Sequence, residues 1–440
     1  MTRPIATRPI ATRPIATRPI ATRRVVLLLN NPFTADSRSW KLAGSLARAD
    51  CTVTVVARAA DGLPGREQRE GFTIVRVTQP RPLPWLPVRG LPAAGAARPR
   101  RRLHDGVGRA AQAIRYLLLT RAWAAAIAKQ IDGAEVWQSE GLVTLPVALA
   151  LRHKLGGVVV YDSRDLHVES GRFARLPGPW RRLLAGRERA WARSADALVT
   201  VNRPYARELE RMLGRAATVV FNGPQATSAA EPNASDHTPP RIFHERFGLS
   251  ATTRIVLAVG AVVPNRGIEQ ACEAMGMVDD AVLVVVGDGE AKPRIAAWAG
   301  TLGHASRIRF LEAVPPDELP RLTAAADVAV MPIQPSTLNH RLTTPTRLFD
   351  ALGAGVPVVA SDLPGMAEIV RETGCGVLCD PASPADIARA LREVLDAPAD
   401  RRATWRAASL AAARGPYAWG RQVETLLALY ESIAPRAVRP

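Results

Sequence analysis

The sequence predicts an α/β protein with two domains, each built on a sheet of parallel strands. With 440 residues, the chain is too long for one ordinary domain and suits two domains of roughly 170–200 residues each. Apolar runs of strand length alternate with helical segments twice, in residues 24–222 and again in residues 241–410. Residues 223–240 are rich in Pro, Ser and Ala and lack periodicity, so they are expected to link the domains.

The chain begins with four copies of the pentapeptide TRPIA, in residues 2–21. The regularly repeated proline prevents a helix, and the arginines leave little to bury. We therefore expect residues 1–23 to be a disordered basic extension and the fold to start at Arg24.

The first domain opens with the apolar run Val25–Leu29, a polar loop, apolar residues at helical spacing around Trp40, and the apolar run Thr52–Ala57. Strand, loop, helix and strand in this order are typical of a parallel α/β domain, in which ligands meet the carboxyl ends of strands. No glycine-rich phosphate turn follows the first strand, so the sequence predicts no dinucleotide site there.

A strongly basic segment follows, from Arg81 to about Ala128, with nine arginines against the single acid Asp105. Trp85 and Trp123 supply apolar anchors among these charges. Basic residues interleaved with Trp and Leu suit a surface that binds anionic lipid headgroups. The alternative is a solvated loop followed by an ordinary amphipathic helix. Nucleic-acid binding is disfavoured, because no recognition module accompanies the charge.

The rest of the first domain continues the alternation. Strands are expected at residues 136–137, 157–161, 197–201 and 218–221, and helices at residues 142–155, 178–195 and 204–213. Polar residues follow the buried strand Gly157–Tyr161, at the carboxyl end where active-site groups of parallel sheets gather. These residues are Asp162, Arg164, Asp165, His167 and Glu169.

The second domain repeats the pattern. Strands are expected at residues 255–259, 281–286, 307–311, 327–331 and 374–378, and helices from residue 268, at 317–325 and from 384 to about 397. An amphipathic helix of roughly residues 420–433 is expected in the tail, residues 411–440.

Residues 343–361 form the most informative stretch, with a helix, a glycine turn and a buried strand expected in that order. Thr344 suits the helix cap, and the proline after it suits the first helical position. Thr346, Arg347 and Asp350 share one face near the start of the helix. The exposed helix start favours an anion, and the carboxylate one turn later favours hydroxyl groups. Phosphate together with hydroxyls indicates a sugar nucleotide.

The composition restricts the partners and the compartment. The formal net charge is +18 and 47% of residues are hydrophobic, so two well-buried cores and anionic partners are expected. The four cysteines lack a zinc-ligand pattern and suit buried positions in a reducing cytosol. The sequence shows neither a run of about 18 apolar residues nor a secretion signal, so a cytoplasmic location is expected.

Taken together, these landmarks resemble the retaining glycosyltransferases of family 4, also called glycosyltransferase group 1. The motifs that carry the resemblance are Asp36-Ser37-Arg38, Tyr161-Asp162-Ser163-Arg164-Asp165, Gly260 with Asn265-Arg266-Gly267-Ile268-Glu269, Val286-Gly287-Asp288-Gly289, and Pro345-Thr346-Arg347-Leu348-Phe349-Asp350 with Gly355-Val356-Pro357-Val358-Val359. The resemblance covers residues 24 to about 432. It implies the GT-B fold, with two facing Rossmann-like domains and a C-terminal helix that returns to the N-terminal domain.

The resemblance also implies where the substrates bind. Arg266 matches the basic residue that binds the donor diphosphate, and Asp350 matches the acid that holds the ribose hydroxyls. The implied donor site in the C-terminal domain comprises Gly260, Arg266, Gly287, Asp288, Thr344, Thr346, Arg347 and Asp350. The implied acceptor side comprises Asp36, Arg38, Arg164 and Glu169. Residues expected at the reacting centre are Arg266, Asp350, Asp165 and His167.

Three positions depart from the family pattern. The first acid of the E-x7-E motif falls at Leu342, and the basic residue that often follows the first glycine is Ala261. The histidine common after the Tyr-Asp strand is replaced by Arg164, with His167 close by. Recognition of the sugar hydroxyls must therefore use other residues.

The resemblance implies a transferase that moves a sugar, with retention, from a nucleoside-diphosphate sugar to a glycan, glycolipid or other hydroxyl acceptor. Protein cations would stabilise the leaving diphosphate, so no metal or other cofactor is expected. The expected location is cytoplasmic, peripheral at the inner face of the plasma membrane. Rival interpretations are a nucleotide-sugar epimerase on the same fold, a non-catalytic scaffold derived from a transferase, and a nucleic-acid-binding protein.

Overall fold

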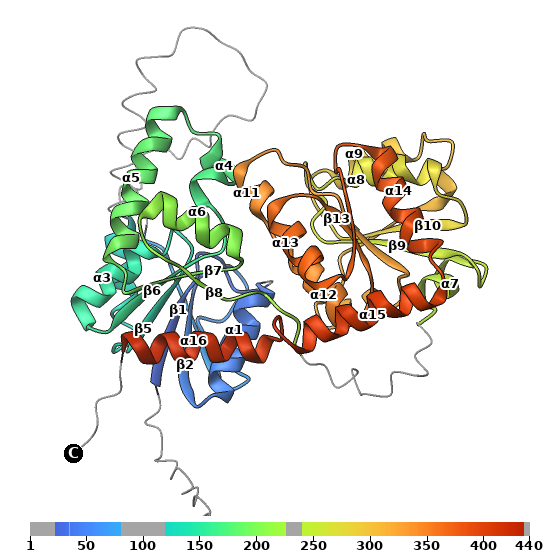
Figure 1. The fold of residues 1–440 in the computed structure, drawn as a ribbon. Helices are drawn as coiled ribbons and strands as arrows, with labels where there is room; N and C mark the ends of the chain where they lie inside the picture. Colours follow the sequence, from blue (N-terminus) through green and yellow to red (C-terminus); the bar gives the residue numbers. More distant parts are fainter. Residues whose placement is uncertain (1–22, 35, 81–118, 226–239, 435–440) are drawn as a thin grey trace, which may run out of the picture.

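The computed structural model describes residues 23–34, 36–80, 119–225 and 240–434, which form two α/β domains side by side (Figure 1). The TRPIA repeats and residues 81–118 of the basic segment lie outside the described residues, so the expected lipid-binding surface falls largely outside them. None of the described helices combines the length and hydrophobicity that a membrane crossing requires.

The N-terminal sheet has eight strands in the order β3-β4-β2-β1-β5-β6-β7-β8. Their bounds are β1 (Arg23–Leu28), β2 (Cys51–Arg58), β3 (Arg66–Arg69), β4 (Phe72–Val77), β5 (Val136–Glu140), β6 (Val158–Ser163), β7 (Ala197–Thr200) and β8 (Thr218–Val219). The strand β1 starts two residues before the expected run Val25–Leu29. The expectation that Arg23 belongs to a disordered extension is wrong, because Arg23 is buried and hydrogen-bonded to the Tyr430 carbonyl. The helices of this domain are α1 (Ser37–Arg48), α3 (Leu145–Leu155), α4 (Gly171–Ala174), α5 (Gly178–Ser194) and α6 (Arg203–Leu213).

The hairpin β3–β4 is antiparallel and was not expected from the sequence. Its turn residues Glu70 and Gly71 both have positive φ, +46° and +82°. A two-residue turn with this backbone fits the right-handed twist of the flanking strands. The charged strand β3 lies at the edge of the sheet, so it lacks the apolar pattern that revealed the other strands.

The C-terminal sheet has six parallel strands in the order β11-β10-β9-β12-β13-β14. Their bounds are β9 (Arg254–Val259), β10 (Ala281–Val286), β11 (Ile308–Leu311), β12 (Val328–Met331), β13 (Val358–Ser361) and β14 (Gly376–Cys379). The helices are α7 (Ile242–Phe247), α8 (Ile268–Ala274), α9 (Lys292–Ala299), α10 (Leu319–Ala324), α11 (Leu338–Leu342), α12 (Thr346–Ala354), α13 (Pro364–Thr373), α14 (Pro384–Leu395) and α15 (Ala399–Arg414). Of these, α7, α9, α11, α13 and α15 were not expected from the sequence.

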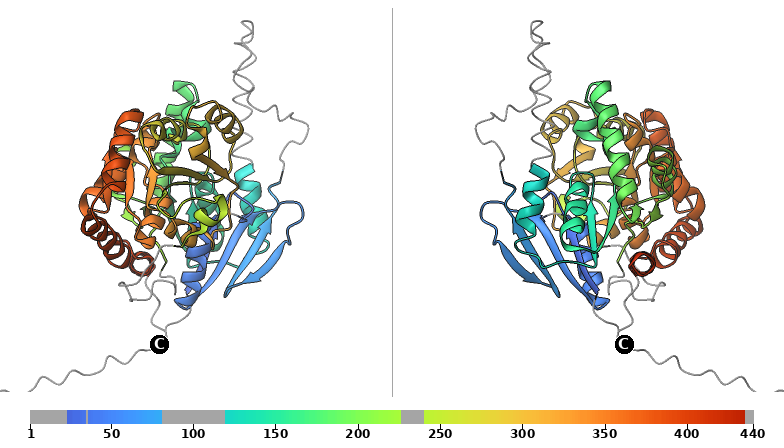
Figure 2. Two further views of the ribbon diagram at one scale, coloured as in Figure 1. Left: turned by 90° about the vertical axis from the view of Figure 1, so that its right-hand side faces the viewer. Right: turned by 90° about the vertical axis from the view of Figure 1, so that its left-hand side faces the viewer.

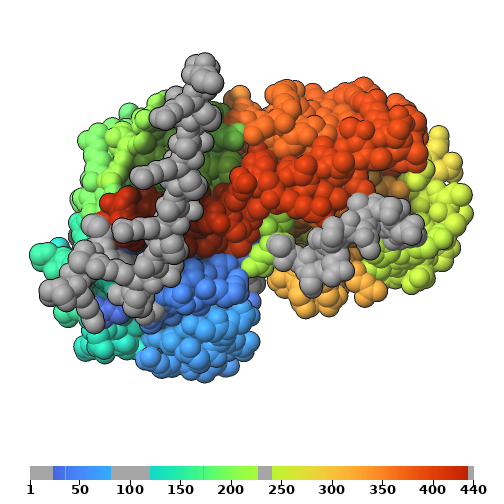
Figure 3. All heavy atoms as spheres, turned by 60° about the horizontal axis from the view of Figure 1, so that its bottom comes forward, coloured from blue at the N-terminus to red at the C-terminus, as the bar shows by residue number. Residues whose placement is uncertain are grey.

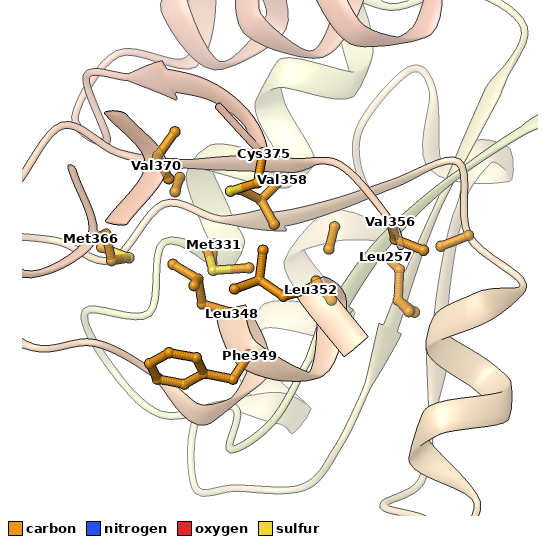
Figure 4. Close-up of a cluster of buried hydrophobic side chains, with 14 of the residues drawn as sticks. Leu257, Met331, Leu348, Phe349, Leu352, Val356, Val358, Met366, Val370 and Cys375 are labelled. Atoms are coloured by element: carbon orange, nitrogen blue, oxygen red, sulfur yellow. The ribbon is translucent and has the colours of Figure 1, made fainter. Parts of the chain in front are cut away.

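The helix α12 is fixed by its apolar face. Leu348, Phe349 and Leu352 are at most 1% exposed and point into a cluster that includes Met331 and Val358 (Figure 4). Burying each such side chain contributes about 1.5–3 kcal/mol. The opposite face, with Arg347 and Asp350, is therefore held toward the N-terminal domain.

The last helix, α16 (Trp419–Ile433), leaves the C-terminal domain and packs on the N-terminal one. The Trp419 indole donates to Ser45 Oγ at 2.9 Å, and Arg23 donates to the Tyr430 carbonyl at 2.6 Å. The red segment in Figure 3 continues onto the N-terminal domain, and the end-on views of Figure 2 place the C-terminal helices along one outer side. The expected GT-B arrangement is confirmed.

Candidate active site

A cavity of about 500 Å³ lies between the two domains, and we call it the interdomain cavity. It is bounded by loops at the carboxyl ends of the N-terminal strands and by the start of α12. The lining residues are Asn31, Thr34, Asp36, Ser37, Arg38, Arg164, Val201, Asn222, Thr344 and Thr346. Nearly all of them are polar, so the cavity suits a hydroxylated or charged ligand.

The start of α12 differs from the expectation in one respect. Pro345 is the cap residue and the helix begins at Thr346, so the expected cap Thr344 is wrong. The Thr344 hydroxyl donates to the Gly365 carbonyl at 2.6 Å and accepts from Asn202 at 3.0 Å, so it is not available to cap the helix. No side chain caps α12, which leaves its first N–H groups as an anion site beside the cavity.

Two expected donor-site glycines allow a very close approach of neighbouring loops. Gly260 ends β9 with φ of +120°, and Gly287 ends β10 with φ of +148°. A Cβ at Gly287 would lie 2.0 Å from the Gly260 carbonyl oxygen, so no other residue fits there without a shift. The two loops are thereby held together next to α12.

Asp288 follows Gly287, and its carboxylate is hydrogen-bonded to neighbouring protein groups. Its carboxylate accepts from Lys292 at 2.9 Å and from the Ala313 N–H at 3.0 Å. The hydrogen bond from Lys292 is the main reason that the pKa of Asp288 falls to about 2. Asp288 therefore ties the β10 loop to the loop after β11 and is exposed on its outer side.

Arg347 lies against the end of β9. Its Nη1 donates to the Val259 carbonyl at 2.8 Å, and its buried Nε has no partner among the described residues. Burial, and then the positive charge of Arg266, lower the pKa of Arg347 to about 9, while Asp350 opposes the shift. The guanidinium thus lies beside Gly260, the residue before Ala261, at which the sequence lacks the expected basic residue.

Arg266 is held by a strained turn between β9 and α8. Asn265 and Gly267 on either side have φ of +68° and +74°, and a Cβ at Gly267 would lie 1.9 Å from the Pro332 carbonyl oxygen. Burial lowers the pKa of Arg266, and the charge of Asp165 opposes this. The guanidinium forms no hydrogen bond or ion pair with any described residue.

Asp350 lies one turn into α12. Burial raises its pKa to about 6, and the charges of Lys41 and Arg347 oppose the shift. Lys41 belongs to α1 of the other domain, donates to the Gly223 carbonyl at 2.6 Å and lies 4.1 Å from the Trp419 ring centroid. Burial is also the main cause that lowers the pKa of Lys41 to about 7. The sequence offered no signal for Lys41, because its role depends on how the domains meet.

The expected acceptor residues are largely engaged with one another. Arg164 pairs with Asp36 at 3.1 Å and with Glu140, and Asp36 also caps α1 by accepting from the Ser39 N–H at 3.1 Å. Arg38 donates to the Val220 carbonyl at 3.1 Å. Asp36, Arg38 and Arg164 nevertheless line the interdomain cavity, so each presents part of its surface to a ligand.

His167 and Glu169 lie in a 3-10 turn after β6 and do not line the interdomain cavity. The His167 ring stacks on Tyr161, with centroids 6.3 Å apart, and its buried Nε2 has no partner among the described residues. Burial lowers the pKa of His167. Glu169 lies 3.9 Å from Arg181. Asp165 is nearer to the C-terminal domain, where the Asn339 side chain donates to it at 3.0 Å.

The described residues include no group of three or more His, Cys, Asp and Glu side chains arranged to hold a metal ion. The cationic groups Arg266 and Arg347 and the start of α12 instead converge on the same side of the C-terminal sheet.

Comparison with known proteins identifies this part of the chain. Residues 241–410 match the family model of glycosyl transferases group 1. They form a group 1 glycosyltransferase domain. Arg266, Arg347, Asp350 and both close-packed glycines lie inside this group 1 domain, and the lone cation Arg266 belongs to it.

The chain is also similar to proteins that are named as glycosyltransferases. The 2-deoxystreptamine glucosyltransferase of Streptomyces kanamyceticus is 27% identical over 368 residues, which cover 82% of this chain and 89% of that protein. A D-inositol 3-phosphate glycosyltransferase of Acidothermus cellulolyticus is 30% identical over 275 residues. That match covers 59% of this chain and 58% of the relative, so the chain spans little more than half of that protein.

Solved structures share the fold. Sucrose-phosphate synthase of Thermosynechococcus elongatus superimposes with a TM-score of 0.71 at 17% identity, covering 93% of this chain and 99% of that chain. HepE of Anabaena, in complex with UDP and glucose, has a TM-score of 0.65 at 15% identity, covering 93% and 100%. The chain therefore has the GT-B fold, and its residues 241–410 match the glycosyl transferases group 1.

Proposed function

We propose that this protein transfers a sugar, with retention, from a nucleoside-diphosphate sugar to a hydroxyl acceptor. The observation that carries the proposal is Arg266, a half-buried cation without a protein partner among the described residues, in a group 1 glycosyltransferase domain. A cation that is partly withdrawn from water and has no ion-pair partner is stabilised when an anionic ligand compensates its charge. A diphosphate supplies that compensation.

The donor diphosphate is proposed to bind between Arg266, Arg347 and the start of α12. Arg347 provides the second cation in place of the basic residue that is Ala261 in this chain. The uncapped N–H groups of Thr346 and its neighbours add hydrogen-bond donors. Asp350 then accepts hydrogen bonds from the ribose hydroxyls, one helical turn further along α12. The UDP complex of HepE is consistent with a nucleotide ligand for this fold.

The proposed chemistry uses these charges when the sugar–phosphate bond breaks. Negative charge develops on the leaving diphosphate, and Arg266 and Arg347 stabilise it more strongly in the transition state than in the ground state. The acceptor hydroxyl attacks from the same face that the diphosphate leaves, which retains the anomeric configuration. The leaving phosphate accepts the hydroxyl proton. These two cations make a metal ion unnecessary in the proposed reaction.

The acceptor is proposed to enter from the N-terminal side of the interdomain cavity, past Asp36 and Arg164. The polar lining fits the hydroxylated head of a glycan, glycolipid or cyclitol. We further propose a cytoplasmic enzyme at the inner face of the plasma membrane, with a contact formed by the basic segment of residues 81–128. Charge reversal of its arginines should abolish binding to anionic vesicles and leave binding to neutral vesicles unchanged.

The test of the function is a thermal-shift panel of UDP-, GDP-, ADP- and TDP-sugars, followed by product analysis with the sugar that binds. A ligand at one hundred times its Kd adds about 2.7 kcal/mol of stability. We expect one nucleotide series to stabilise the wild type and to lose this effect in Arg266→Ala. Transfer of the sugar to an added acceptor, or its slow hydrolysis, supports a transferase. An interconverted nucleotide sugar would support the epimerase, and binding without turnover would support the scaffold.

A further inference from the structure

The short helix α11 belongs to the C-terminal domain but packs against the N-terminal one. Leu338 and Leu342, one helical turn apart, contact the buried cluster formed by one face of the N-terminal sheet and its helices. Leu342 stands where the family resemblance would place an acid. Between these leucines, Asn339 is 4% exposed. The helix α11 is therefore a bridge between the domains.

The Asn339 side chain forms its hydrogen bonds with residues of the N-terminal domain. Its Nδ2 donates to Asp165 Oδ1 at 3.0 Å, while its Oδ1 accepts from the Leu166 N–H and the Tyr205 hydroxyl, each at 2.7 Å. A backbone N–H is always a donor, so it fixes Oδ1 on that side and Nδ2 toward Asp165. The Asn339 carboxamide therefore donates to Asp165 and accepts from Leu166 and Tyr205 at the same time.

Asp165 in turn faces the charged groups of the donor side. Its negative charge raises the pKa of Arg266 and of His340, and in both groups burial lowers the pKa more strongly. The Ser336 hydroxyl oxygen is 2.7 Å from His340 Nδ1. Asn339 therefore holds a carboxylate next to the cation that we assign to the diphosphate.

We propose that Asn339 is a positioning residue that couples domain closure to the orientation of Asp165. Its partners lie on the opposite domain, so its hydrogen bonds form only when the domains are closed. With one Asp165 oxygen held by Asn339, the other oxygen accepts a hydrogen bond from the acceptor hydroxyl and orients it for attack. This role rests on the proposed glycosyl transfer.

The decisive variant is Asn339→Asp, which keeps the shape and the acceptor oxygen but removes the donor. At pH 8 the new carboxylate faces Asp165, so repulsion replaces the hydrogen bond. We expect kcat to fall at least tenfold and the donor KM to change less than threefold. At pH 5.5 a protonated Asp at this position donates to Asp165 again, and the deficit should shrink to less than threefold.

The neighbouring charged and titratable groups are the same in the wild type and in Asn339→Asp. The ratio of the two kcat values at each pH therefore reports on the interaction of residue 339 with Asp165. These groups are Arg164, His167, Tyr205, Arg266 and His340. The control is Arg207→Ala, which removes a 2.7 Å interdomain ion pair with Glu368 and does not touch Asn339. Its kcat should stay within twofold of the wild type. A ratio for Asn339→Asp that is constant with pH would overturn the proposal.

The exchange variant Asn339→Asp with Asp165→Asn reverses donor and acceptor and should restore the bond. Small-angle scattering measures closure without any substrate. We expect a larger radius of gyration for Asn339→Asp at pH 8, and the wild-type value for that variant at pH 5.5 and for the exchange variant at both pH values. The exchange variant should remain at least tenfold low in kcat, because the acceptor-facing carboxylate is gone.

The activity and scattering measurements distinguish failure of the proposed function from failure of the role of Asn339. A wild type that turns over no nucleotide sugar would refute the proposed function, and scattering would still decide whether Asn339 controls closure. An unchanged radius of gyration in Asn339→Asp would refute the closure role, and full activity of the exchange variant would refute the role of the Asp165 carboxylate.

Discussion

The Arg347 guanidinium lies against the backbone of Gly260, so that a Cβ at this glycine would be 2.8 Å from Arg347 Nη1. Gly260 also has φ of +120°, which side chains disfavour. The glycine at the end of β9 therefore leaves room for a cation that comes from α12. This relationship is the basis of our proposal that Arg347 replaces the basic residue that is Ala261 in this chain.

Replacing Gly260 by alanine should destabilise the protein and displace Arg347. We expect a loss of about 1–3 kcal/mol in urea unfolding from the strained backbone and the close contact. Gly374→Ala is a matched control, because its φ is +64° and nothing lies within 4 Å of the added Cβ. The double variant Gly260→Ala with Arg347→Ala should recover the part of the stability loss that comes from the contact between the new Cβ and the Arg347 guanidinium. Equal losses in Gly260→Ala and Gly374→Ala would contradict the importance of the contact.

Removing Arg347 should weaken donor binding about tenfold to a hundredfold, since a charge-assisted hydrogen bond contributes about 1.5–3 kcal/mol. Adding Ala261→Arg to Arg347→Ala should restore most of the affinity, because Ala261 directly follows the glycine that Arg347 contacts. Titration calorimetry with the nucleotide that the thermal-shift panel selects measures both effects. If Ala261→Arg gives no recovery while Arg347→Ala binds weakly, the two positions do not serve the same phosphate.

Glu188 predicts a pH dependence of stability that does not involve the ligand. This side chain is 2% exposed, and burial raises its pKa to about 7, although a 2.7 Å hydrogen bond from Tyr161 opposes the shift. The folded protein thus binds the proton more tightly than the unfolded chain. Stability from this group is present below the unfolded pKa of 4.5 and is lost as the pH rises toward 7.

We expect the wild type to lose about 3 kcal/mol from this source between pH 4.5 and 7. Glu188→Gln should flatten that part of the profile, as measured by urea unfolding at several pH values. Glu424→Gln changes an exposed carboxylate on α16 and should leave the profile unchanged. A Glu188→Gln profile parallel to that of the wild type would show that another group causes the decline.

Trp419 should matter for the N-terminal domain although it lies near the end of the chain. Its ring is 4% exposed, donates to Ser45 and covers Lys41. Trp419→Ala should cost about 3–5 kcal/mol of stability. Trp419→Phe keeps much of the apolar area and should cost less. Hydrogen exchange should show the loss of protection in α1. Protection that decreases only within α16 would mean that this helix does not stabilise the N-terminal domain.

Much of the fold was predictable because it depends on local patterns. Continuous apolar runs such as Val25–Leu29 and Ile255–Val259 identify parallel strands buried on both faces, and the strands were placed to within a few residues. The hairpin β3–β4 escaped prediction because its edge strand is charged. The helices α13 and α15 also escaped prediction. The helix α13 begins with Pro364 and Gly365, which are poor helix formers, and α15 is rich in alanine, with Trp405 as its one large buried side chain.

Parts of the site were also predictable. Residues 343–361 indicated a helix start followed by a carboxylate one turn later, and the structure has both, although Pro345 rather than Thr344 is the cap. That this helix start binds an anion stays a prediction. Arg266 came from the resemblance alone. The roles of Asp350 and Arg266 toward a nucleotide sugar stay predictions until a ligand is measured.

The pattern within each domain can thus be read from the chain: most strands and helices, the glycine turns and the group 1 motifs. The contacts between the domains, such as Asn339 with Asp165 and Lys41 near Asp350, become visible only in the folded molecule. The difference arises from the distance along the chain over which each interaction acts. Periodicity and capping act over a few neighbouring residues, whereas interdomain contacts depend on the docking of two complete surfaces, which no local pattern of the chain records.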